Sequence, residues 1–137
     1  LIKRRSLFKV DSSILALGGF YIIVFAAYLF FEYFIVNYRP VLINGFLEAA
    51  YPSSTTMLVM CVMPTAMMQF NRLIKNNKAK NFINTFCGIF TGLMVIGRLV
   101  SGVHWLTDIL DGALLSTALV MLYFSANKLI DSKKSNE

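Results

Sequence analysis

The chain has 137 residues, of which 57% are hydrophobic and 15% are charged, and its formal net charge is +6. Soluble domains carry about 45–50% apolar and about 25% charged residues, so this composition excludes an ordinary soluble domain and indicates a membrane protein. Its length predicts one domain, residues 1–137. The positive charge does not indicate nucleic acid, because the sequence has no aromatic and basic face of the kind that binds it.

Four apolar stretches predict an all-α integral membrane protein, a bundle of four transmembrane helices. They cover residues 14–36, 55–70, 82–100 and 105–130. The first follows a basic leader, residues 1–9, and contains one charge, Glu32. As a helix it would be about 35 Å long, enough to cross a hydrocarbon core of about 30 Å. Residues 37–54 are predicted to form a loop, with a short interfacial helix around residues 46–50.

The later stretches carry features that bear on packing. Pro64 lies inside the second stretch and would kink its helix, which membrane helices tolerate. Gly88 and Gly92, in the third, have the spacing that lets two helices approach closely. After the fourth stretch, residues 132–137 form a polar tail for which we expect no regular structure.

The basic residues predict the orientation in the membrane. Of the 13 Lys and Arg residues, all but Arg39 and Arg98 lie in the leader, between the second and third stretches, or near the C-terminus. Four spans place these three regions on one side, which the positive-inside rule makes cytoplasmic. Both termini would then be cytoplasmic, and Arg39, Arg98 and His104 would gather on the opposite face of the cell membrane.

Residues 98–108 combine Arg98, the chain's only histidine (His104) and Asp108 within apolar sequence. Ionisable groups at membrane depth tend to mark functional sites. On a helix, Asp108 would reach one ring nitrogen of His104, fix the tautomer, and leave the other nitrogen free for nucleophilic or acid–base chemistry. The Ser101-Gly102 pair offers a break that could fold Arg98 back toward His104. The alternative is an interfacial histidine with a capping aspartate and a snorkelling arginine.

Further polar groups at the same predicted face indicate an anion site. Arg39 follows the first stretch, and Ser53 and Ser54 stand where the second begins. Guanidinium groups match phosphate oxygens, and the N-termini of helices carry partial positive charge. An oriented histidine beside a phosphate suggests phosphoryl transfer. Neither a metal ligand set nor a cofactor site is predicted, because Cys61 and Cys87 have no partner at ligand spacing and no acidic cluster suits magnesium.

These residues resemble the motifs of the type-2 phosphatidic acid phosphatases, membrane lipid phosphate phosphatases related to vanadium haloperoxidases. The family motifs are K-x6-R-P, P-S-G-H and S-R-x5-H-x3-D. The third is matched by Arg98, His104 and Asp108, the first by Arg39-Pro40, and the second by Pro52-Ser53 with Ser54 in the glycine position. The resemblance covers roughly residues 32–112. The family usually has six spans, and this chain looks like the last four, which carry the catalytic part.

The resemblance implies roles for the matched residues. His104 would be the nucleophile that forms a phosphohistidine, and Asp108 would orient it. The phosphate would be bound by Arg39, Arg98, Ser53, Ser54 and neighbouring backbone amides. The implied substrate is a phosphorylated lipid: phosphatidic acid, phosphatidylglycerol phosphate or a polyprenyl diphosphate.

Two positions depart from the family pattern. Glu32 stands where the family has the lysine of its first motif, and Thr55 stands where it has the histidine that protonates the leaving group. General acid catalysis is typically worth about 10²–10⁴-fold, and a threonine hydroxyl is too weak an acid to supply it. Three explanations are open: an engineered inactive form, a natural pseudoenzyme, or an enzyme for substrates with a good leaving group. We expect an enzyme scaffold whose catalysis is impaired in this chain. A non-catalytic protein that keeps the pocket for lipid binding or transport is the alternative, and a purely structural subunit is a third reading.

Overall fold

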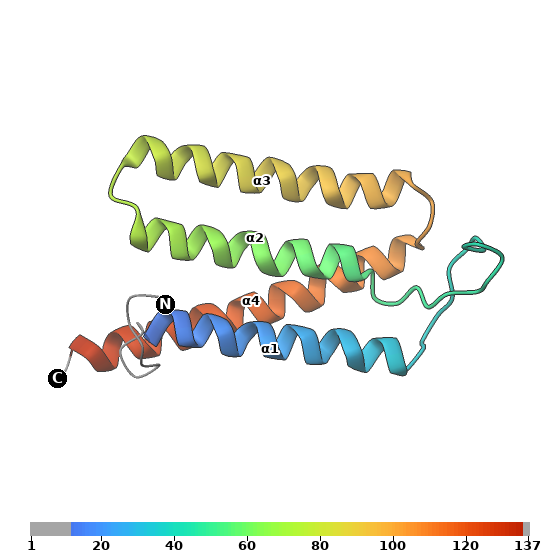
Figure 1. Ribbon diagram of the computed structural model, residues 1–137, viewed down its shortest axis with the longest axis horizontal. Coiled ribbons are helices and arrows are strands. Elements are labelled where there is room, and N and C mark those ends of the chain that lie inside the picture. The colour runs from blue at the N-terminus through green and yellow to red at the C-terminus, as the bar shows by residue number, and fades with distance from the viewer. Residues whose placement is uncertain (1–11, 136–137) are drawn as a thin grey trace.

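The computed structural model describes residues 12–135, with side chains described to residue 132. The described part is all-α (Figure 1). Its helices are α1 (Ser12–Tyr33), α2 (Ser54–Leu73), α3 (Asn77–Val100) and α4 (Leu106–Ser135). Each lies within a few residues of a stretch expected from the sequence, except that α4 continues into the polar tail as far as Ser135. The basic leader lies outside the described residues.

Helix α2 is central to the bundle. It packs against α3 and α4 most extensively and also against α1, whereas α1 and α3 do not contact each other (Figure 1). The buried hydrophobic core lies between α1, α2 and α4. Its members are Phe20, Val24, Met57, Cys61, Leu119 and Tyr123. Helix α3 contributes none of these side chains, so it packs against α2 outside this core.

Three helices are long and apolar enough to cross a membrane: α1, α3 and the Leu106–Ser132 part of α4. Helix α2 falls short of this by composition, although a span was expected there. The reason lies in its position, since it meets other helices rather than lipid. It buries Thr65 and Gln69, and the Gln69 amide donates to the Tyr123 hydroxyl at 2.7 Å. Polar bonds of this kind join helices inside membranes.

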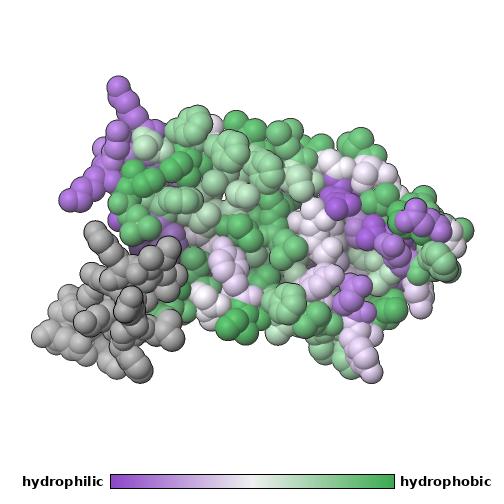
Figure 2. Space-filling model, viewed as in Figure 1, coloured by the Kyte–Doolittle hydropathy of each residue, from purple (hydrophilic) through white to green (hydrophobic). Residues whose placement is uncertain are grey.

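The surface has the distribution of polarity that a membrane protein needs. Figure 2 shows apolar residues over the middle of the bundle and polar residues at both ends. Large apolar side chains on the outer faces of the helices are exposed, for example Phe25 (60%), Leu93 (64%) and Leu122 (67%). Such exposure is costly in water and favourable in lipid. The all-α membrane fold expected from the composition is therefore confirmed.

The loop between α1 and α2 differs from the expectation. Residues 46–50 form no helix; instead, isolated antiparallel bridges join Tyr38 to Ala49 and Ile43 to Phe46. The turn between the second pair is made by Asn44 and Gly45, whose φ values are +50° and +82°. Asn-Gly favours this left-handed, two-residue turn, which reverses the chain as a hairpin.

Helix α2 continues through Pro64 as one helix, so the proline is tolerated inside it. The packing expected at the glycines of α3 differs from the structure. A Cβ added at Gly88 or Gly92 would meet no atom within 4 Å, so these glycines make no close helix contact inside the described chain. The close approach occurs at Gly112 instead, where an added Cβ would lie 3.1 Å from the Ser53 carbonyl oxygen. Spacing alone could not tell which glycine faces another helix.

Candidate active site

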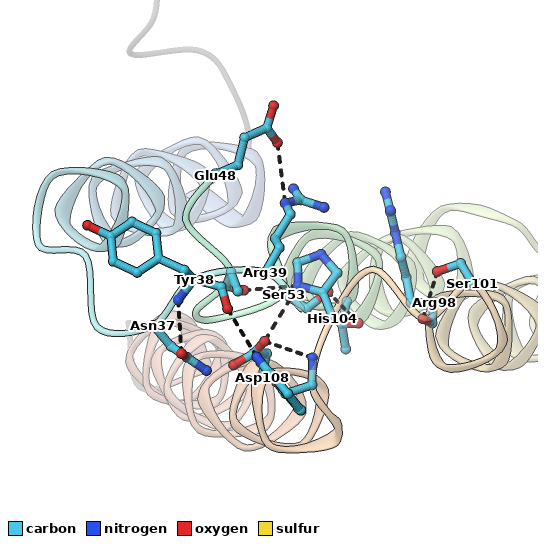
Figure 3. A network of polar contacts seen from close by, with 12 residues as sticks. Asn37, Tyr38, Arg39, Glu48, Ser53, Arg98, Ser101, His104 and Asp108 are labelled. Carbon is cyan, nitrogen blue, oxygen red and sulfur yellow. Dashed lines mark hydrogen bonds and ion pairs between the residues drawn. The ribbon is translucent and has the colours of Figure 1, made fainter. Parts of the chain in front are cut away.

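The hairpin-like loop positions Arg39 beside Glu48. The backbone N–H of Arg39 donates to the backbone carbonyl of Glu48 at 3.1 Å, and the backbone N–H of Ala50 donates to the backbone carbonyl of Asn37 at 2.9 Å. The two side chains form an ion pair, with 3.3 Å between Arg39 Nε and Glu48 Oε2 (Figure 3). The Arg39 Nε makes no hydrogen bond within the described chain, so the contact is an ion pair without hydrogen-bond alignment. Glu48 was not singled out from the sequence.

His104 lies in the turn between α3 and α4. Gly102 has a φ of +65°, a left-handed conformation that favours glycine, so the expected break after α3 is where the chain reverses. The His104 side chain is only 2% exposed, and its Nδ1 lies 3.0 Å from the Ala50 carbonyl oxygen. Because a carbonyl only accepts, Nδ1 carries the proton and Nε2 keeps its lone pair in the neutral ring. Nε2 is buried and has no hydrogen-bond partner among the described residues.

Asp108 lies in the first turn of α4 and is fully buried. Its Oδ2 accepts the N–H of Trp105, the residue directly before the helix, at 3.0 Å, which caps the N-terminus of α4. Its distance to His104 Nδ1 is 3.8 Å, too long for a hydrogen bond. The bond expected from the four-residue spacing is therefore not formed, because His104 precedes the helix instead of lying on it. Asp108 acts on the ring through its charge, and the Ala50 carbonyl provides the hydrogen bond.

The surroundings of His104 keep its ring neutral. Burial lowers the pKa of His104 most, and the positive charges of Arg39 and, more weakly, Arg98 lower it further. The Ala50 carbonyl and the Asp108 carboxylate act in the opposite direction, and the net effect is a pKa below the ordinary value. At neutral pH the ring is thus unprotonated, as a nucleophile must be.

Arg98 lies near the end of α3 and turns toward α2. Its Nη2 donates to the Thr55 hydroxyl, and the Ser101 hydroxyl donates to the Arg98 carbonyl at 2.8 Å. In Figure 3, Arg98 lies apart from Arg39 and His104, although its positive charge contributes to lowering the pKa of His104.

A cavity of about 420 Å³ opens beside His104. The polar and charged side chains on its wall are those of Tyr28, Glu32, Arg39, Glu48, Tyr51, Ser54 and His104. Of the residues expected at the site, it therefore brings together Arg39, Ser54 and His104 with the divergent Glu32. Arg98, Thr55, Asp108 and Ser53 do not line it.

Ser53 does not line the cavity but connects the helices around it. It is fully buried at the start of α2, where its hydroxyl accepts from Thr56 at 3.1 Å. Its N–H donates to the Asp108 carbonyl at 2.9 Å, which joins the N-terminal ends of α2 and α4. Ser53 therefore joins the start of α4 to the start of α2, and α2 lines the cavity with Ser54 and Met57.

Some groups at this candidate site could not be found from the sequence. The Ala50 carbonyl is a backbone atom, and no side-chain pattern marks it. Glu48 can be recognised only once the hairpin is known, because the hairpin makes it the cross-strand neighbour of Arg39. No group of three or more His, Cys, Asp or Glu within residues 12–135 is placed to hold a metal ion.

Comparisons with known proteins identify the family of this chain. A comparison with curated proteins gives no match. The chain is similar to the crystal structure of a transmembrane PAP2-type phosphatidylglycerolphosphate phosphatase from Bacillus subtilis, with 25% sequence identity and a TM-score of 0.62. The match covers 86% of this chain and 58% of that one, so this chain spans little more than half of its length. The PAP2 superfamily pattern matches residues 13–130, which is most of the sequence, and the chain belongs to the PAP2 superfamily.

Proposed function

We propose that this chain is a membrane phosphatase that hydrolyses a phosphorylated lipid through a phosphohistidine on His104. The observation that carries the proposal is the state of the His104 ring. Its Nδ1 is bonded to the Ala50 carbonyl, and its unpartnered Nε2 belongs to a side chain that lines the same cavity as Arg39. A lone pair next to a guanidinium is the arrangement needed to attack a bound phosphate.

The reaction then has two displacement steps. Nε2 attacks phosphorus, the bond from phosphorus to the leaving oxygen breaks, and that oxygen takes up a proton. Water next attacks the phosphohistidine, which releases phosphate and restores the ring. Arg39 and Ser54 would hold the phosphate oxygens, Arg98 would add positive charge from α3, and Asp108 would stabilise the transient imidazolium at 3.8 Å.

The proposed substrate is a lipid phosphomonoester or diphosphate. The similar Bacillus subtilis protein is named for phosphatidylglycerolphosphate, which supports a phospholipid of this kind. Phosphatidic acid and a polyprenyl diphosphate satisfy the same chemistry. A diphosphate would depend less on a general acid, because its leaving group is phosphate and needs less protonation than an alkoxide.

We further propose that protonation of the leaving group is impaired. Thr55 does not line the cavity, and its hydroxyl accepts a hydrogen bond from Arg98. A hydroxyl in that position cannot supply a proton as readily as an imidazolium. The departure from the family pattern at residue 55 therefore affects the acid step and leaves the nucleophile intact.

The proposed site faces the side of the membrane opposite the cytoplasm. The turn between α2 and α3, the start of α1 and the end of α4 lie at one end of the bundle, and the loops that carry Arg39 and His104 lie at the other (Figure 1). Lys75, Lys78 and Lys80 belong to the first end, which the positive-inside rule assigns to the cytoplasm.

Phosphate release from lipid substrates by the purified full chain tests the proposal. His104→Ala is expected to abolish release, whereas Ser101→Ala, in the same turn, should retain it. Incubation with a ³²P-labelled substrate, followed by rapid denaturation, should leave acid-labile and base-stable label on the wild type only. Release that persists in His104→Ala would contradict the phosphohistidine.

A second candidate function is phosphate-lipid binding without turnover. The observation that favours it is Thr55, because the general acid is missing while the cavity and Arg39 remain. Orthovanadate binding with no phosphate release from any of the three substrates would support this function over the enzyme.

A further inference from the structure

The charge on the cavity wall does not match a purely anionic ligand. Among the described residues that line the cavity, Arg39 is the one cation, and Glu32 and Glu48 are carboxylates. His104 is neutral at physiological pH, as its lowered pKa requires. A phosphomonoester carries a charge of about −1.5 to −2 at pH 7, so it would enter a cavity whose wall already has an excess of negative charge.

Binding of phosphate to Arg39 must also deal with the existing ion pair. Glu48 holds the guanidinium at 3.3 Å, and its side chain is 46% exposed, so it is free to move away. A substrate that bears only negative charge would replace one ion pair with another and leave Glu48 facing the phosphate. Like charges at such range oppose binding.

A substrate that also carries an ammonium group would resolve both conflicts. Its phosphate would pair with Arg39 and its ammonium group would pair with Glu48. Two ion pairs with the ligand would then replace the one between Arg39 and Glu48. The rings of Tyr28, Phe31 and Tyr51 line the same cavity, and aromatic faces attract cations. Phe31 and Tyr51 already pack edge to face, with ring centroids 5.5 Å apart.

We propose that the cavity takes the phosphomonoester of an amino alcohol, with the phosphate between Arg39 and His104 and the ammonium group on Glu48 and Glu32. This inference rests on the proposed function and names the substrate class of the same site. The buried, unpartnered Nε2 of His104 fixes the phosphate end of the cavity, and the 3.3 Å separation of Arg39 and Glu48 requires the two charges of the ligand to be close together. A two-carbon link between nitrogen and oxygen meets that requirement.

Two soluble probes that differ only in the amine test the proposal: 2-aminoethyl phosphate and ethyl phosphate. Their dissociation constants would be measured by calorimetry on the full chain in detergent, with EDTA present. The wild type is expected to bind 2-aminoethyl phosphate about fivefold more tightly, the upper range for a solvent-exposed ion pair. Glu48→Gln should weaken 2-aminoethyl phosphate and tighten ethyl phosphate, so that the preference is lost or reversed.

Two further variants separate the Glu48 contact from a general change in charge. Asp131→Asn removes a carboxylate that forms the same type of exposed ion pair with Arg72, at the other end of the bundle, and should leave the preference unchanged. Glu32→Gln removes a cavity carboxylate that has no pair with Arg39 and should reduce the preference less than Glu48→Gln does. A folding check by thermal unfolding accompanies each variant.

The outcomes distinguish this inference from the proposed function. Failure to bind either probe overturns both. Equal binding of the two probes by the wild type, or an unchanged preference in Glu48→Gln, overturns the amino-alcohol inference and leaves the phosphate site standing. Tighter ethyl phosphate binding that appears only when Mg²⁺ replaces EDTA would mean that a metal neutralises the carboxylates, which also overturns it.

Discussion

A backbone carbonyl determines which nitrogen of the only histidine keeps its lone pair. The Ala50 oxygen accepts from His104 Nδ1 at 3.0 Å, which leaves the lone pair on Nε2. Asp108, whose position in the motif predicted this role, stays 3.8 Å away and caps α4 through the Trp105 N–H. Orientation of the ring and its electrostatic support are thus provided by two different residues.

The first residue-scale prediction concerns the titration of His104. Burial and then Arg39 lower its pKa, so the ring should titrate below the ordinary histidine range in an NMR titration. Because the sequence has one histidine, selective ¹³C-histidine labelling gives a single signal. Arg39→Gln should move the midpoint to higher pH, and Arg39→Lys, which keeps the charge, should move it much less. Equal shifts in both variants would remove Arg39 as a cause.

The direction of the shift also sets the pH dependence. A lowered pKa in the folded state means that the unfolded chain binds more protons between the two pKa values, so the contribution of His104 to stability falls as pH drops through that window. Activity should be lost in the same direction, because a protonated Nε2 has no lone pair to attack phosphorus.

The second residue-scale prediction concerns Thr55. Thr55→His should raise turnover about 10²-fold or more on a phosphomonoester, because it restores an acid that can protonate the leaving alcohol. Thr55→Asn provides a donor of no useful acidity and should remain near the wild type. Steady-state phosphate release measures both, and unchanged turnover in Thr55→His would remove the argument that the acid is lost.

At the scale of elements, the start of α2 is fixed by its contact with α4. The Ser53 N–H donates to the Asp108 carbonyl at 2.9 Å, and Gly112 of α4 lies close to the Ser53 carbonyl oxygen. The hairpin-like loop adds Arg39 and Ala50 to the same end of the bundle. The cavity is lined by the end of α1, the loop between α1 and α2, the start of α2, and His104 in the turn before α4. Its shape therefore depends on how closely these segments pack.

The element-scale prediction compares two glycines. Gly112→Ala would place a Cβ 3.1 Å from the Ser53 carbonyl oxygen, so α2 and α4 must separate slightly. We expect a loss of about 1–3 kcal/mol in unfolding free energy and reduced activity. Gly92→Ala meets nothing within 4 Å and should be neutral or stabilising by up to about 1 kcal/mol. Thermal unfolding in detergent measures both, and equal effects would contradict the close approach at Gly112.

At the scale of the whole molecule, the polar ends and the apolar middle define a membrane-crossing bundle. Figure 2 shows this division on one face, and the exposed apolar side chains extend it to the helix surfaces in general. Because α2 contacts the other three helices, it carries buried polar residues such as Thr65 and Gln69 beside the apolar core.

The molecule-scale prediction is the orientation of the bundle. Phe46, in the loop at the site end, is 74% exposed, and Lys75 is exposed in the turn at the other end. In whole cells, Phe46→Cys should react with a membrane-impermeant maleimide, and Lys75→Cys should react only after permeabilisation. The native Cys61 and Cys87 are buried and provide a low background. The reverse pattern would invert the proposed topology.

Much of this protein follows from the order of its residues. Hydropathy predicted all four helices, because lipid requires long apolar segments whose backbone bonds are satisfied internally. The spacing of Arg98, His104 and Asp108 identified the PAP2 superfamily, because the identity and spacing of these side chains can be read directly from the sequence. The Ser101-Gly102 break was also readable, because a left-handed φ favours glycine.

Only the tertiary structure decided which groups meet. The sequence could not show that the Ala50 carbonyl replaces Asp108 on the His104 ring, because a hydrogen bond to a backbone atom leaves no trace in side-chain identity. Nor could it pair Arg39 with Glu48 or assign the close helix contact to Gly112, since both depend on how the loop and helices pack. Short-range preferences determine the helices, whereas contacts between distant residues depend on the fold as a whole.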